Sequence, residues 1–184
     1  MVVARTLERM LMRKLLWLAA AVVLTSCGRN GSLRLSWPTT IGGLEGFSDT
    51  QREAVMGAIS QLNVKIKRTM VSPAGLQTQE SEEGSPIYFR FAENIPEQKK
   101  VIAGRATVDG EKCVIQISSV VANNNELLVP VIWHELGHCA GLDHDPKSGE
   151  VMYSSTVSMK NYNEATLGRF FDRVLEASGL SAAP

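Results

Sequence analysis

The residues best suited to chemistry lie within one run of eleven, residues 134–144, which reads HELGHCAGLDH. In a helix of 3.6 residues per turn, His134 and His138 are four positions apart and share one face, so their imidazoles can bind one metal ion together. Glu135 lies about 100° further round the helix, close enough to act on a water molecule at that ion. The spacing therefore predicts a metal site with a carboxylate base beside it.

The end of the same run supplies a third nitrogen. Gly141 can adopt a left-handed conformation at low cost, which makes it a natural place for the helix to end and the chain to turn back. This turn would bring His144 to the other two histidines. Three histidines with an open fourth position form the ligand set of a catalytic zinc ion, whereas structural sites are closed by four protein ligands. We therefore predict Zn²⁺ as the cofactor and Glu135 as the catalytic residue.

An alternative interpretation is that these histidines are incidental residues of a helix. The chain contains only three histidines, however, and all three fall within this run. The predicted helix is also amphipathic, because apolar side chains recur on the side away from the histidines, at Val129, Ile132, Trp133, Leu136 and Ala140. One face would pack on a core, and the histidine face would look into a cleft.

The motif, followed by Val151-Met152-Tyr153, resembles the metzincin zinc peptidases, and the matrixin branch in particular. In that family a methionine lies in a tight turn beneath the metal, and Met152 is placed to match it. Gly137 also resembles the matrixins, whereas Asp145 stands where they usually have serine and is closer to the adamalysin pattern.

This resemblance implies a zinc-dependent endopeptidase. It also implies the zincin fold, an α+β fold in which a twisted mixed sheet carries two helices and a small C-terminal subdomain ends in a helix. By analogy with the family, a protein or peptide substrate would add to the edge strand of the sheet, for which residues 103–108 are the candidate.

The first 26 residues read as a signal peptide. Basic residues precede an apolar run of ten, residues 15–24, which is too short to span a bilayer stably. Residues 24–27 (LTSC) resemble a bacterial lipobox, with lipid attachment at Cys27; the alternative is an ordinary secretory signal with a chance cysteine. Gly28 in place of aspartate favours the outer membrane. Two or three acyl chains would anchor the protein stably in the cell envelope, facing the periplasm or the exterior, with residues 27–32 as a tether.

The remainder, residues 33–184, suits one catalytic domain. The whole chain has 184 residues, of which 44% are hydrophobic, and 19 basic residues balance 19 acidic ones. A chain of this length can bury a core of its own. The balanced charge gives no case for nucleic-acid binding, because the sequence shows no basic stripe that would release counterions from phosphates. We expect a monomer.

The pattern along this domain predicts alternating strands and helices. Hydrophobic periodicity and turn residues indicate strands at 33–37, 64–68, 87–91, 103–108 and 113–118, helices at 49–62, from about 126 through the motif and from 164 to about 178, and loops at 39–47 and 72–85.

Two cysteines remain inside the domain, Cys113 and Cys139. Outside the cytoplasm they could form a disulfide, with two buried free thiols as the alternative. A role for either as a zinc ligand is not expected, because three histidines complete the usual catalytic set.

Two further functions compete with the endopeptidase. One is a non-catalytic envelope lipoprotein that uses a zincin fold to bind a partner; Glu135 argues against it, because a binding protein needs no base beside the metal. The other is a zinc hydrolase that acts on cell-wall peptides.

Overall fold

The computed structural model describes residues 35–67, 69–72, 86–97, 100–154 and 162–180. Its element order is β1 (Thr39–Glu45), α2 (Asp49–Lys65), β2 (Val71–Ser72), β3 (Ile87–Ala92), β4 (Pro96–Glu97), β5 (Lys100–Val101), β6 (Gly104–Asp109), β7 (Lys112–Ser118), α3 (Ser119–Ala122), α4 (Asn125–Cys139) and α5 (Glu164–Ala177). Among these residues, no helix is long and apolar enough to cross a membrane.

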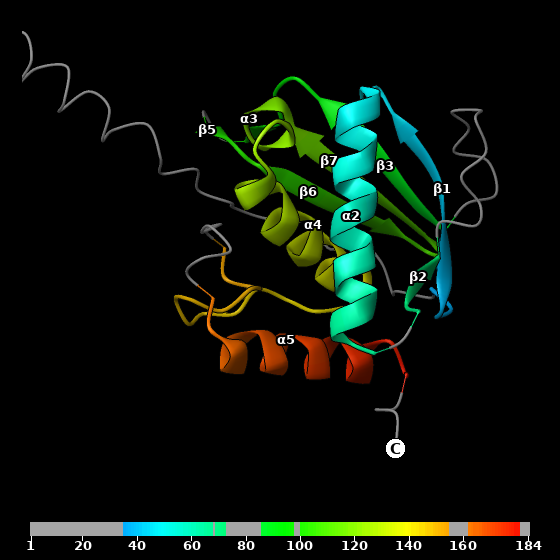
Figure 1. Cartoon of the computed structure of the whole chain (residues 1–184), viewed down its shortest axis with the longest axis vertical. Coiled ribbons are helices and arrows are strands. Elements are labelled where there is room, and N and C mark those ends of the chain that lie inside the picture. The colour runs from blue at the N-terminus through cyan, green and yellow to red at the C-terminus, as the bar shows by residue number, and fades with distance from the viewer. Residues whose placement is uncertain (1–34, 68, 73–85, 98–99, 155–161, 181–184) are drawn as a thin grey trace, which may run out of the picture.

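Five strands form one mixed sheet in the order β2-β1-β3-β7-β6. The pairs β1–β2, β1–β3 and β3–β7 are parallel, and β6 runs antiparallel to β7 at one edge. Helices α2 and α4 lie together over one face of this sheet, and α5 crosses below them (Figure 1). The predicted α+β fold, with two helices on a mixed sheet and a helix at the C-terminal end, is confirmed.

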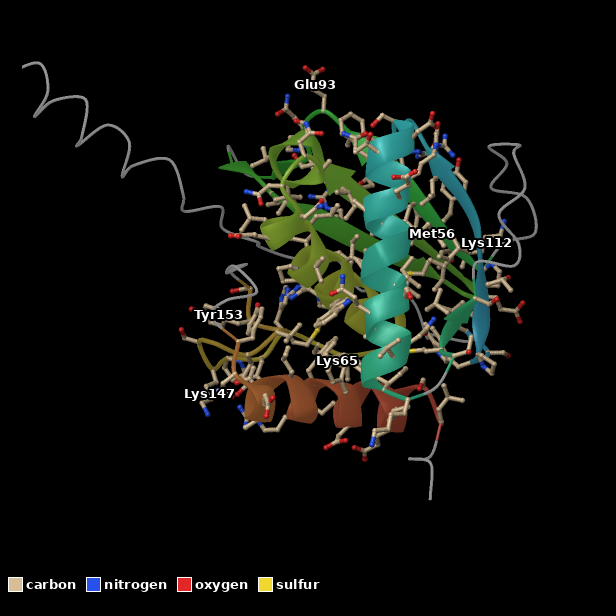
Figure 2. All side chains as sticks on the ribbon, viewed as in Figure 1. Met56, Lys65, Glu93, Lys112, Lys147 and Tyr153 are labelled. Carbon is tan, nitrogen blue, oxygen red and sulfur yellow. A yellow bond between two sulfur atoms is a disulfide. The ribbon has the colours of Figure 1, made fainter. Side chains whose placement is uncertain are left out.

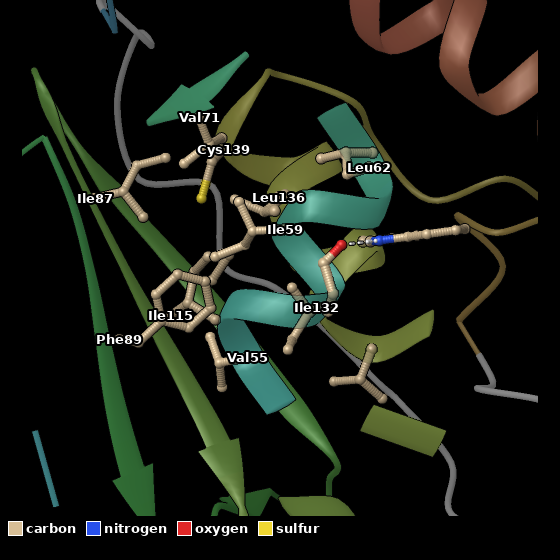
Figure 3. Close-up of a cluster of buried hydrophobic side chains, with 14 of the residues drawn as sticks. Val55, Ile59, Leu62, Val71, Ile87, Phe89, Ile115, Ile132, Leu136 and Cys139 are labelled. Atoms are coloured by element: carbon tan, nitrogen blue, oxygen red, sulfur yellow. Dashed lines mark hydrogen bonds between the residues drawn. The ribbon is translucent and has the colours of Figure 1, made fainter. Parts of the chain in front are cut away.

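The core lies between the sheet and the two helices. Figure 3 shows apolar side chains of α2, α4, β3 and β7 converging there: Val55, Ile59, Leu62, Ile132, Leu136, Ile87, Phe89 and Ile115. The indole Nε1 of Trp133 donates a hydrogen bond of 2.8 Å to the carbonyl of Ala58, which joins α4 to α2 inside this core. The motif helix is therefore held against the sheet on its apolar face, as the sequence pattern predicts.

Each of the three long helices begins at a side chain that caps it. Ser48 caps α2 and forms a capping box with Gln51. Asn124 accepts from Glu126 N at the start of α4, and Asn163 accepts from Thr166 N at the start of α5. Each cap satisfies a backbone N–H that the helix itself leaves without a partner.

Two strand predictions near the N-terminal end of the domain are wrong. The first strand is residues 39–45, where a loop was predicted, and residues 35–38 are irregular; Leu33 and Arg34 lie outside the described residues. Gly43 suggested a loop. A Cβ there would lie 2.6 Å from Cε2 of Tyr88, so glycine makes room on β1 for the tyrosine ring of β3.

The predicted strand at 64–68 is wrong, because α2 continues to Lys65 and Ile66 is its C-cap; Arg68 lies outside the described residues. Val64 suggested a buried strand position but is 71% exposed on the helix surface. Asn63 explains the change of element, because its side chain binds the backbone of Met70 and Val71 and so places the short strand β2 beside the last turn of α2.

Candidate metal centre

Helix α4 carries the first two histidines and ends just after them. Ala140 is the C-cap residue, and Gly141 follows with a φ of +98°. Leu142 N donates to the carbonyl of Gly137, and Gly141 N donates to that of His138, both at 2.9 Å. This is a Schellman motif, in which the left-handed glycine reverses the chain. The predicted turn at Gly141 is present, and it returns the chain toward the histidine face of α4.

The three histidines converge. Nε2 of His138 lies 3.1 Å from Nε2 of His134 and 3.2 Å from Nε2 of His144. Among the described residues these three form a group whose ligand atoms all lie within 4.8 Å of one another. The structure thus brings together the three residues that the sequence singles out as metal ligands.

The hydrogen bonds of the two Nδ1 atoms show that the Nε2 atoms of His134 and His138 carry the free lone pairs. Nδ1 of His134 lies 2.7 Å from the carbonyl of Val151, and Nδ1 of His138 lies 2.7 Å from that of Leu142. A carbonyl only accepts, so each Nδ1 must donate, and a neutral imidazole then has a bare Nε2. Two bare nitrogens 3.1 Å apart repel each other unless a cation lies between them.

The spacing suits Zn²⁺. Zinc–nitrogen bonds of about 2.0–2.1 Å in tetrahedral geometry place neighbouring nitrogens about 3.3–3.4 Å apart. The observed 3.1 and 3.2 Å agree to within a few tenths of an ångström. The donor set of three imidazoles, two of them oriented by backbone carbonyls, therefore fits this ion.

His134 is held in its neutral form by its surroundings. Its side chain is 2% exposed. Burial is the largest cause that lowers the pKa of His134 from 6.5 to about 3; the neighbouring His138 and His144 act in the same direction, and the hydrogen bond to Val151 has a smaller opposing effect. A neutral imidazole is the form that binds a metal ion, so His134 is ready for a cation across the whole neutral range.

This pKa makes the stability of the metal-free protein depend on pH. Between pH 6.5 and 3 the unfolded state binds a proton at His134 that the folded state does not, so stability falls as the pH falls through this window. At pH 5 the loss is about 2 kcal/mol relative to pH 7.5. Urea unfolding in chelator at both pH values measures it. The variant His134→Gln should lack this component, and an equal pH dependence in both proteins would contradict the assignment.

Glu135 points to the strand at the edge of the sheet. Its side chain is 1% exposed. A Cβ added to Gly104, the first residue of β6, would lie 2.7 Å from Glu135 Oε1. The carboxylate of the predicted base is thus packed directly beneath the edge strand, next to the helix face that carries the histidines.

Met152 lies beneath the motif helix. It is fully buried, and a Cβ added to Gly137 would lie 2.5 Å from its sulfur. Asp145 N donates to Met152 O at 2.8 Å, so the residue after the third histidine is paired with the methionine turn. The predicted methionine turn and the histidine motif are therefore in contact, with Gly137 as the point of close approach.

Replacing Gly137 by alanine should destabilise the protein by about 1–3 kcal/mol, because the added methyl group overpacks the space filled by Met152 and Phe170. Gly168→Ala is the matched control, since Gly168 also lies within a helix and a Cβ there meets nothing within 4 Å. That change should stabilise by up to about 1 kcal/mol through helix propensity. Chemical denaturation of both variants measures the difference, and a gain of stability in Gly137→Ala would rule out the tight contact.

Ion pairs attach the methionine turn to α5. Asp145 pairs with Arg173 at 2.8 Å, and the buried Glu150 pairs with Arg169 at 2.6 Å. Lys147 and Tyr153, labelled in Figure 2, lie on the same segment between α4 and α5. The two ion pairs were not predicted from the sequence; the spacing of Arg169 and Arg173, four apart on one helix, was the available signal.

Two of the three cysteines form a disulfide, and the third lies outside the described residues. Cys113, at the start of β7, and Cys139, the last residue of α4, form a disulfide. The bond fixes the end of the motif helix to the sheet immediately after His138. Cys27 lies outside the described residues, and its lipidation stays a prediction.

Comparison with known proteins gives a similarity of structure only. No protein-family model matches the sequence, and no curated protein matches it. Among solved structures, the chain is similar to archaemetzincin from Methanopyrus kandleri, with 16% sequence identity, a TM-score of 0.46, and coverage of 74% of this chain and 94% of that one. The functional interpretation therefore depends on the residues of the site.

Proposed function

We propose that this chain is a zinc-dependent endopeptidase of the matrixin-like type. One observation carries the proposal: two imidazole nitrogens with bare lone pairs and a third from His144 meet at one point, and the adjacent carboxylate of Glu135 is buried beneath an edge strand. His134, His138 and His144 would hold Zn²⁺. When bound, the ion would supply Lewis-acid chemistry, which polarises a peptide carbonyl and makes an attacking water more acidic.

The edge strand supports a peptide as the substrate. Ser118 N donates to Ala103 O, which makes Gly104 and Ile117 a pair that exchanges no hydrogen bonds. The backbone N–H and C=O groups of Gly104 therefore point away from β7, and by alternation so do those of Ala106. An extended peptide would add along these groups as a further strand.

Glu135 would act as the general base. Its carboxylate would accept a proton from the attacking water and pass it to the amine that leaves. Burial keeps this carboxylate close to the edge strand, so proton transfer would occur beside the bound peptide backbone. We propose that the substrates are proteins or peptides of the cell envelope, which the signal sequence and Cys27 predict as the location.

Cleavage of a peptide library tests this function. The full chain is incubated with the library, and separately with peptidoglycan stem peptides, with and without a zinc chelator, and products are identified by mass spectrometry. Chelator-sensitive cleavage of internal bonds in the library supports the endopeptidase. Cleavage restricted to stem peptides would favour a cell-wall hydrolase, and zinc binding without any cleavage would favour a non-catalytic binding protein.

A further inference from the structure

Gly104 occupies a position where the structure has no room for a side chain. A Cβ built there would lie 2.7 Å from Glu135 Oε1, 3.0 Å from Glu135 Cγ and 2.7 Å from Val131 Cγ1. The two separations of 2.7 Å are too short for non-bonded atoms, and the separation of 3.0 Å is tighter than most contacts of a Cβ atom. The contact joins residues 31 positions apart in the sequence, one on the edge strand and one on the motif helix, so the closeness of β6 to α4 at this point requires glycine.

Of the two neighbours of Gly104, Val131 has less freedom to move than Glu135. Val131 is fully buried in the middle of α4, and a β-branched side chain in a helix has one strongly preferred rotamer. Glu135 is 1% exposed on the next turn. The backbone of Gly104 is not in the left-handed region, so its conformation alone would accept alanine. Glycine is therefore needed because of the contact with Val131 and Glu135. Of the atoms in this contact, the carboxylate of Glu135 is the group that a larger residue would displace.

We propose that Gly104 is a positioning residue for Glu135. The bare Cα of Gly104 lets the carboxylate lie directly beneath the strand, and this contact sets the separation between the base and the backbone groups that would align a peptide. The inference rests on the proposed function for its catalytic consequence, but the contact itself has consequences for stability that do not require activity.

The substitution Gly104→Ala should lower kcat about 10- to 100-fold, because displacement of a base by about 1 Å costs this much. KM should change little, since the peptide groups of residue 104 remain in place. Zinc content should also be unchanged, because none of the three atoms nearest a Cβ at residue 104 belongs to a histidine. Gly57→Ala is the matched control: a Cβ at Gly57 meets nothing within 4 Å, so kcat should stay at the parent value.

A thermal double-mutant cycle tests the contact without any assay of activity. Gly104→Ala should lower Tm by roughly 3–9 °C in the parent protein, because the added methyl overpacks the interface. In the Glu135→Ala background the same change should cost clearly less, because two of the three clashing atoms belong to Glu135. Gly57→Ala should not lower Tm in either background.

If Gly104→Ala fails to fold, the cycle is run in Val131→Ala, which removes the clashing methyl of the valine and leaves the contact with Glu135. Equal Tm losses in the presence and absence of the Glu135 side chain, or a parental kcat in Gly104→Ala, would overturn the inference. Should the parent protein cleave no peptide, the proposed function falls, and the thermal cycle still decides whether Gly104 positions the carboxylate.

Discussion

Replacing Glu135 by alanine is expected to lower kcat by about 10²–10⁴-fold while the protein stays folded and keeps its zinc. Zinc should remain bound because the three histidines, and not Glu135, would hold the ion. Turnover should fall because proton transfer from the attacking water needs a carboxylate at this position. Peptide cleavage rates, zinc content and thermal unfolding of the variant give the three readouts.

A matched control for this prediction lies on the same helix. Glu126 is exposed in the first turn of α4, away from the histidines, and Glu126→Ala should keep the parent activity. Peptide turnover by Glu135→Ala at a rate comparable to that of the parent would remove Glu135 from the role of base, even if zinc were bound.

The second large effect concerns the disulfide. Its cysteines are 26 positions apart, and both are fully buried. Removing the cross-link by the double change Cys113→Ala and Cys139→Ala should lower the free energy of unfolding by about 3–4 kcal/mol, because the unfolded chain regains the freedom that the closed loop denies it. Urea unfolding of the variant and the oxidised parent measures the loss.

Loss of the disulfide should also affect zinc binding, because of the position of Cys139. Cys139 follows His138 directly, so a looser helix end should also weaken zinc binding in the same variant. Cys27→Ala is the control, since Cys27 belongs to the predicted tether, outside the domain, and should not alter the unfolding midpoint of the domain. Equal midpoints for the double variant and the parent would show that the cross-link does not hold the helix end.

The histidine cluster could be predicted because it depends on local geometry. The spacing of His134 and His138 needs only the period of a helix, and the return of His144 needs only a left-handed glycine at residue 141, whose φ is +98°. The capping residues of the helices could be predicted for the same reason. In each case the information lies within one or two turns of the chain.

The features that the sequence analysis missed depend on contacts between distant segments. Gly43 suggested a loop, but glycine is needed there because the ring of Tyr88, on another strand, leaves no room for a side chain. Gly104 gave no signal of its role, since the carboxylate that it accommodates is 31 residues further along. The ion pair between Asp145 and Arg173 likewise joins the methionine turn to a helix 28 residues away. Such contacts follow from packing, which sequence periodicity does not encode.

Zinc K-edge X-ray absorption on the purified chain shows whether three imidazoles bind one zinc ion. We expect one zinc per chain, with nitrogen or oxygen neighbours at about 2.0–2.1 Å and the scattering pattern of three histidine rings. In His144→Ala we expect one ring fewer in this pattern and weaker zinc binding. A protein that binds no zinc, or a spectrum that has sulfur neighbours or is unchanged in His144→Ala, would show that the three histidines do not form a zinc site.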